Sequence, residues 1–135
     1  MKFTYSTSAP FQSSGDSLPR VELVLEANGR IVSDTGLVDS GATISILPYA
    51  VGLKLGFVWD ESKARVPLSG SLGAFEGIPV LAKGTIGSYK PVDLVFAWVN
   101  SNELPMILGQ TNFFTEFEIH FYRARFEFEV YPRSP

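Results

Sequence analysis

Residues 36–48 read Gly-Leu-Val-Asp-Ser-Gly-Ala-Thr-Ile-Ser-Ile-Leu-Pro. In this stretch the carboxylate of Asp39 stands between an apolar run and a turn made of small residues. Asp-Ser-Gly alone is ordinary turn chemistry, because Asp and Ser bond to the nearby backbone and Gly tolerates unusual dihedral angles. The meaning of the motif therefore depends on what accompanies it along the chain.

The composition is that of one folded domain. A chain of 135 residues can bury a core but cannot form a two-lobed enzyme. Hydrophobic residues make up 45% of it and charged residues 19%, which indicates a globular protein. The net charge of −3 gives no electrostatic reason to expect nucleic acid or a membrane surface as a partner. Cys is absent, which excludes disulfides, thiolate metal sites and Cys nucleophiles.

The N-terminal part of the sequence predicts an arm ahead of the domain. Residues 1–6 lack the apolar region of a signal peptide. No apolar run approaches the roughly 20 residues needed to cross a bilayer, so we expect a cytoplasmic protein. Residues 6–19 are rich in Ser, Gly and Pro. We therefore expect an N-terminal arm or loop over residues 1–19 and a single domain over residues 20–135.

Short strands are expected through most of the domain. Residues 20–26 alternate between polar and apolar, as in a half-buried strand. Asn28-Gly29 follows, a strong hairpin signal because both central residues of a type I′ turn need a positive φ. A return strand is expected over residues 30–33. Pro48 can open a short helix through Leu55, with Gly56 as its stop.

The C-terminal half continues this pattern. Strands are expected over residues 92–99 and 105–109, with a helical turn over residues 111–114. Two alternating runs around a turn at residues 122–125 predict a hairpin that ends near residue 130, in which His120 faces solvent. Many short strands with few helical windows predict an all-β domain.

A second acid, Asp34, is also followed by a hydroxyl residue and Gly. The question is whether Asp34 and Asp39 form a pair of carboxylates within one chain. Five residues of extended chain span about 16 Å. An odd separation also places two side chains on opposite faces of a strand. Neither arrangement suits two carboxylates that share a proton. We therefore interpret Asp34 as a turn acid.

Two more segments accompany the Asp39 motif. Residues 106–109 read Met-Ile-Leu-Gly, and residues 68–75 read Leu-Ser-Gly-Ser-Leu-Gly-Ala-Phe. Together with residues 36–48 they resemble the landmarks of the retropepsin-like aspartic proteases, which are homodimeric single-domain enzymes of retroviruses with cellular and bacterial relatives. The landmarks are the active-site loop, the Gly-rich flap, and an apolar segment ending in Gly that passes close to the loop. The resemblance spans about residues 20–131.

The resemblance implies a fold and an activity. The fold would be a small closed β-barrel with one or two short helices and a flap hairpin. The activity would be aspartic endopeptidase, with a peptide or protein substrate and neither a metal nor a cofactor. Two carboxylates held close together cannot both ionise, so they share one proton. With one Asp39 per chain, the resemblance implies a homodimer. Independently of the resemblance, a cluster of phenylalanines is expected to form part of the core, with some of its members at the subunit interface: Phe113, Phe114, Phe117, Phe121, Phe126 and Phe128.

The resemblance also assigns roles to neighbouring residues. Ser40 would hydrogen-bond across the dimer and brace the two loops. Gly41 would let the substrate backbone approach closely. The flap would close over an extended peptide and bond to it as a strand does, with Leu72 at its tip. The residues expected to bind substrate are Gly41, Ala42, Thr43, Gly70, Ser71, Leu72 and Gly73.

The sequence departs from the family at two charged positions. Many relatives carry Arg directly after the apolar segment, and retroviral members carry an acid four residues after the catalytic Asp. Here the two positions hold Gln110 and Thr43. Losing both charges together leaves neither unpaired. An extra segment around Gly56 to Arg65 also separates the flap from Asp39. The alternative is a non-catalytic module of the same fold that binds peptides or mediates dimerisation.

Overall fold

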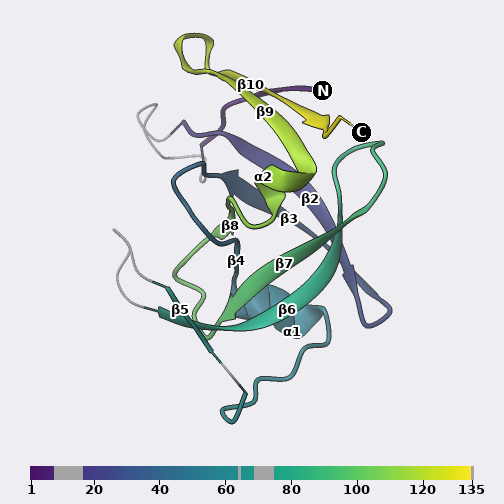
Figure 1. The fold of residues 1–135 in the computed structure, drawn as a ribbon, viewed down its shortest axis with the longest axis vertical. Helices are drawn as coiled ribbons and strands as arrows, with labels where there is room; N and C mark the ends of the chain where they lie inside the picture. The colour runs from purple at the N-terminus through teal and green to yellow at the C-terminus, as the bar shows by residue number, and fades with distance from the viewer. Residues whose placement is uncertain (8–16, 64, 69–74, 135) are drawn as a thin grey trace.

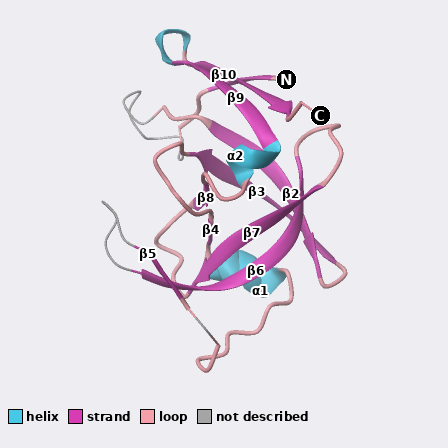
Figure 2. Ribbon diagram, viewed as in Figure 1, coloured by secondary structure: helices cyan, strands magenta, loops and turns pink. Residues whose placement is uncertain are grey.

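Strands dominate the structure, a computed structural model that describes residues 1–7, 17–63, 65–68 and 75–134 (Figure 2). Helices in these residues are short, and none is long and apolar enough to cross a lipid bilayer. The predicted all-β fold is confirmed. In chain order the elements are β1 (Lys2–Thr4), β2 (Arg20–Ala27), β3 (Arg30–Val38), β4 (Ile46–Leu47), α1 (Tyr49–Lys54), β5 (Val66–Leu68), β6 (Phe75–Thr85), β7 (Val92–Val99), β8 (Met106–Leu108), α2 (Phe113–Glu116), β9 (Phe117–Tyr122), the 3-10 turn η2 (Arg123–Arg125) and β10 (Glu127–Pro132).

Six of the strands in the described residues form a closed barrel (Figure 1). They are hydrogen-bonded in the order β2, β3, β8, β4, β7 and β6, and pairing of β2 with β6 closes the ring. Closure leaves no unpaired strand edge within the ring. Side chains that point inward from β2, namely Val21, Leu23 and Leu25, are almost fully buried. The alternation that predicted this strand is therefore the alternation between barrel interior and solvent.

The hairpin of β2 and β3 forms as predicted but extends further. Asn28 and Gly29 have φ values of 53° and 72°, which is the left-handed conformation that the turn requires. The pairing continues to the register pair Arg20↔Leu37, so β3 ends at Val38 rather than at residue 33. Asp34 lies inside β3, opposite Leu23. Its interpretation as a turn acid is wrong, because pairing with the longer β2 keeps the backbone extended through that position.

β8 lies between β3 and β4. Ile107 at its centre pairs with Leu37 on one side and with Ile46 on the other. β8 is parallel to β3 and antiparallel to β4. The chain that leaves β3 must therefore cross the end of β8 before it can enter β4. This crossing loop contains Asp39.

The two ends of the chain form a second sheet, in which β10 lies between β1 and β9. Residues 2–4, within the range expected to be an arm, pair with β10 as β1. Figure 1 shows both termini beside this sheet, at the same end of the molecule. The N-terminal segment is thereby fastened to the C-terminal hairpin.

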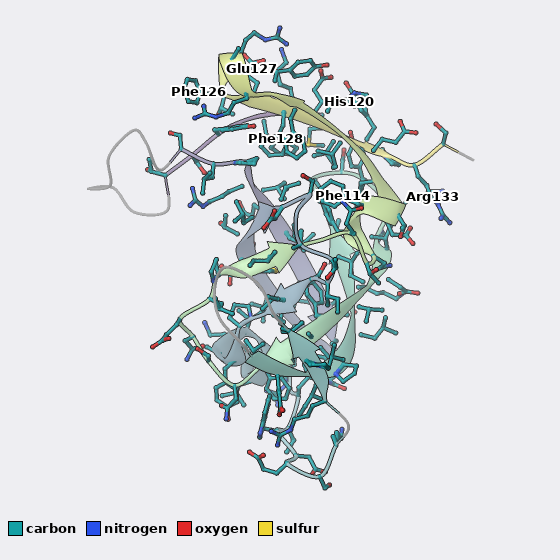
Figure 3. The ribbon with its side chains drawn as sticks, turned by 60° about the vertical axis from the view of Figure 1, so that its left-hand side comes forward. Phe114, His120, Phe126, Glu127, Phe128 and Arg133 are labelled. Atoms are coloured by element: carbon teal, nitrogen blue, oxygen red, sulfur yellow. The ribbon has the colours of Figure 1, made fainter. Side chains whose placement is uncertain are left out.

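The phenylalanines predicted to form a core divide into two groups. Phe113, Phe117 and Phe128 are buried, and Phe114 is partly buried. Phe121 and Phe126 are 39% and 46% exposed. Figure 3 shows Phe126 at the outer end of the hairpin, and it follows η2 in a left-handed conformation outside β10. Phe121 and Phe126 therefore do not belong to the core. His120, on the same hairpin, is exposed as predicted.

Helix α1 packs closely on the barrel through a glycine. Pro48 precedes the helix and Gly56 follows it with a φ of 83°, close to the predicted bounds. The ring of Trp98, which is fully buried, stacks on Tyr49 at 5.6 Å, and its indole N–H donates to the Tyr49 carbonyl over 3.1 Å. A Cβ on Gly52 would lie 2.0 Å from Trp98 Nε1. Only a residue without a side chain lets α1 approach this indole.

Gly52→Ala is expected to lower the free energy of unfolding by about 3 kcal/mol, because Trp98 is enclosed and the added methyl overpacks the site. Chemical denaturation followed by Trp fluorescence measures the change. Leu53→Ala is the control on the same helix, where the Leu53 side chain is 43% exposed. This control should change stability by less than about 1 kcal/mol. Equal effects of the two substitutions would contradict the close packing of α1 on Trp98.

Candidate active site

The loop over residues 39–45 connects β3 to β4 and carries Asp39. The Asp39 N–H donates to the Leu108 carbonyl over 3.0 Å, which extends the pairing of β3 with β8 by one residue. The chain then turns at once. Asp39 Oδ1 accepts the N–H of Gly41 over 2.9 Å, and the Asp39 carbonyl accepts the N–H of Ala42 over 3.2 Å. The carboxylate is therefore held by its own turn, at the edge where two parallel strands end.

The underside of this loop rests on Gly109. A Cβ on Gly109 would lie 2.7 Å from the carbonyl oxygen of Ala42 and 2.9 Å from that of Ile44. Both neighbours are backbone atoms, so they cannot rotate away as a side chain would. The apolar segment ending in Gly therefore passes against the loop, as the resemblance implied.

Ser45 connects the loop to the same glycine. Its side chain is 1% exposed, and its Oγ accepts the Gly109 N–H over 2.9 Å. Without this hydroxyl a buried N–H would lose its partner. The sequence analysis did not assign a role to Ser45. The available signal was one hydroxyl within the otherwise apolar residues 44–47.

A short backbone ladder continues beyond Gly109. Gln110 N–H donates to the Ala42 carbonyl over 2.8 Å, and Thr111 N–H donates to the Thr43 carbonyl over 3.0 Å. The Gln110 side chain also contributes, because its Nε2 donates to the Ser40 carbonyl over 2.8 Å. The position at which many relatives carry Arg therefore supports the loop here through a neutral hydrogen bond.

Two hollows flank the loop. One, of about 370 Å³, is lined by Asp39 and Ser40 together with apolar side chains that include Leu18, Leu37 and Phe121. The other, of about 210 Å³, lies between the loop and β5, where Pro67 and Leu68 form its far wall. Asp39 is half-buried, whereas Ser40 and Gly41 are exposed. The loop is therefore accessible to a peptide or to another protein chain.

The predicted site residues are brought together only in part. Gly41, Ala42 and Thr43 line the hollow beside β5. β5 and β6 pair antiparallel from Val66↔Gly77 to Leu68↔Phe75, as the two arms of the predicted flap would. The proposed tip of the flap lies outside the described residues: Gly70, Ser71, Leu72 and Gly73.

Asp34 belongs to a different place in the structure. It lines a separate hollow of about 500 Å³ with Arg20 and Lys54, and its Oδ1 accepts the Thr35 N–H over 2.8 Å. Asp39 does not line that hollow. The described residues therefore give no indication that the two acids act as a pair within one chain. At the loop, one chain supplies a single carboxylate with the exposed Ser40 and Gly41 beside it, and β5 lies across the hollow. These elements suffice for half of an acid–base site.

Comparison with solved structures identifies the fold. A retropepsin-like aspartic protease from Rickettsia conorii is similar with a TM-score of 0.61 at 14% identity, over 97% of this chain and 98% of its own. EIAV protease complexed with the inhibitor HBY-793 is similar with a TM-score of 0.54 at 16% identity, over 73% of this chain and 88% of its own. No family model and no curated protein matches the sequence. The chain has the retropepsin-like fold, as the sequence landmarks predicted.

Ser45→Ala is expected to lower the free energy of unfolding by about 1–3 kcal/mol, because it leaves the buried Gly109 N–H without an acceptor. Denaturant unfolding measures the loss. The control is Ser33→Ala, which removes an exposed hydroxyl that donates to Glu22 over 2.7 Å. This control should stay within about 0.5 kcal/mol of the parent protein. If Ser45→Ala were equally neutral, the Ser45–Gly109 bond would not be supporting the loop.

Proposed function

We propose that this chain is an aspartic endopeptidase that acts as a homodimer, with Asp39 of each protomer at the two-fold axis. The observation that carries the proposal is the placement of Asp39. It lies on a loop supported by Gly109, Ser45 and Gln110, accessible beside two hollows, within a retropepsin-like fold.

The chemistry requires two such carboxylates. The ionised Asp39 takes a proton from a water molecule, whose oxygen attacks the carbonyl carbon of the scissile peptide bond. The protonated Asp39 of the partner donates to the carbonyl oxygen. The Asp39 that took the proton from water then gives it to the amide nitrogen, and the partner's Asp39 takes a proton back from a hydroxyl of the tetrahedral intermediate. The C–N bond breaks as that hydroxyl becomes a carbonyl, and the pair again shares one proton. Each chain contributes one acid, and dimerisation completes the site.

The surface beside Asp39 suits a second copy of the chain. Leu18 and Phe121 are each 39% exposed, and both line the hollow that Asp39 shares. Exposed apolar side chains next to a functional group are typical of a contact surface. A two-fold interface is self-complementary, so the same residues would meet their own copies across the axis. The interface and the catalytic pair would therefore form in one step.

Substrate would bind across the loop, on the side that faces β5. Gly41, Ala42 and Thr43 form one wall of the hollow there, and Pro67 and Leu68 form the other. The lining side chains are small or apolar except for Thr43, but most of the exposed surface of the hollow is polar, which favours hydrogen bonds to the backbone of an extended peptide. The segment with Gly70, Ser71, Leu72 and Gly73 connects β5 to β6 and would complete the enclosure as the flap.

Asp39→Asn is expected to reduce cleavage of a denatured protein by more than about 100-fold, because Asn has nearly the shape of Asp but cannot exchange the proton. Cleavage is measured from acidic to neutral pH, with sedimentation to confirm that the variant keeps the assembly of the parent protein. Asp34→Asn is the matched control and should cleave at close to the parent rate. Full activity of Asp39→Asn would exclude the proposed mechanism.

Mixed dimers separate this mechanism from a single-chain one. An excess of Asp39→Asn chains should suppress the activity of the parent protein once subunits exchange. Activity proportional to the parent chains alone would show that one chain suffices. A parent protein that cleaves nothing at any of these pH values would favour the non-catalytic binding or dimerisation module.

Phe121→Asp is expected to weaken dimerisation by about tenfold or more, because it places a carboxylate at the proposed contact surface. Activity should then depend steeply on protein concentration and recover at high concentration. Ile31→Asp is the control, since Ile31 is 70% exposed and lies at the turn end of β3, far along the strand from Asp39. Unchanged association of Phe121→Asp would place the interface elsewhere.

A further inference from the structure

The segment between α1 and β5 is fastened at several points. Figure 1 shows it at the foot of the molecule, below the β6–β7 hairpin. Asp60 closes a turn in which its Oδ1 accepts both the hydroxyl of Ser62, over 2.7 Å, and the N–H of Ser62, over 2.9 Å. These two bonds hold the pKa of Asp60 below its usual value. Residues 60–62 therefore form a defined turn.

Trp59 packs the start of this segment against the core. Its ring meets Trp98 edge-on at 5.3 Å and Tyr49 at 6.0 Å. Trp98 is fully buried in β7, so Trp59 rests on a fixed surface. The indole N–H of Trp59 donates to Glu61 Oε1 over 2.8 Å. Trp59 thus connects the barrel to the turn.

Arg65 extends this connection to both arms of the β5–β6 hairpin. Its guanidinium lies 5.5 Å from the centre of the Trp59 ring and bonds to both the carbonyl and the carboxylate of Glu61. It also reaches Glu76 Oε2 on β6, over 3.1 Å. Arg65 directly precedes β5, and Glu76 is the register partner of Pro67. One side chain therefore joins the barrel, the turn and both arms.

We propose that Arg65, seated on Trp59, is a positioning residue that holds β5 at a set distance from the Asp39 loop. β5 is three residues long and lies at the edge of its sheet, paired with β6 alone among the described strands. So short an edge strand opens readily unless other contacts retain it. Pro67 and Leu68 on β5 form the far wall of the hollow beside Ala42 and Thr43. The effect on catalysis rests on the function proposed above, whereas the effect on β5 does not.

Arg65→Met tests the proposal, because Met keeps much of the apolar stem but removes the charge and the donors. Amide hydrogen exchange at Val66, at Leu68 and in residues 76–77 should be about three- to tenfold faster, while β2 and β7 are unchanged. Lys83→Met is the matched control. It breaks the 3.0 Å ion pair between Lys83, which lies farther along β6, and Asp93 on β7, and these two side chains are 60% and 62% exposed. This control should leave exchange in β5 unchanged.

Glu76→Gln provides a second variant that removes only the cross-strand ion pair. It should speed exchange in β5 in the same direction but to a smaller extent. Exchange at the parent rate in both variants would overturn the proposal, whether or not the protein cleaves peptides.

The kinetic readout tests the catalytic consequence. With an active parent enzyme, Arg65→Met should raise KM for a peptide about three- to tenfold and change kcat less, because it loosens a binding wall and leaves the carboxylates in place. Faster exchange with an unchanged KM would confine Arg65 to a structural role and overturn its role in substrate binding. Absence of cleavage by the parent protein would count against the proposed function alone, since exchange still decides the placement of β5.

Discussion

The site depends on a backbone contact that only glycine permits. Gly109 lies so close to the carbonyls of Ala42 and Ile44 that a Cβ would collide with both. This contact exists because β8 is inserted between β3 and β4, so the connection between those strands must cross the end of β8. The barrel topology and the shape of the Asp39 loop are thus one constraint. A change that moved β8 would move the carboxylate with it.

The support beneath the loop is uneven in a way that suits half of an active site. Below the loop the contacts are numerous, and the Ser45–Gly109 bond among them is buried. Above, Ser40 and Gly41 are exposed, and the described chain offers Asp39 no second carboxylate in the hollow that it lines. Preorganisation of the lower side holds the acid in place without closing the upper side. In the proposed dimer, the partner chain would supply the second acid at little cost in ordering.

Local patterns predicted the elements that are governed by local physics. Asn28-Gly29 formed the expected turn because its φ requirement is a property of two residues. Val92–Val99 was found at its predicted bounds, because a run rich in β-branched and aromatic residues favours a strand. Asp34 was misplaced because its conformation is set by pairing with β2, which the residues around it do not reveal. Ser45 and Arg65 were missed for the same reason, since their partners are distant in the sequence or on another strand.

Gln110 and Thr43 are neutral at the two positions where the viral enzymes carry charged residues. The Asp39 loop therefore has a different kind of support here. A guanidinium at position 110 would bring a positive charge beside Ser40 and would need an acid nearby to balance it. The Gln110 amide instead donates one uncharged hydrogen bond to the Ser40 carbonyl. Its strength depends little on ionic strength, because salt screens charges rather than dipoles. In the proposed dimer, the Gln110 amide would add no charge next to the two Asp39 carboxylates, so the sharing of their proton would depend on the two acids and their immediate surroundings.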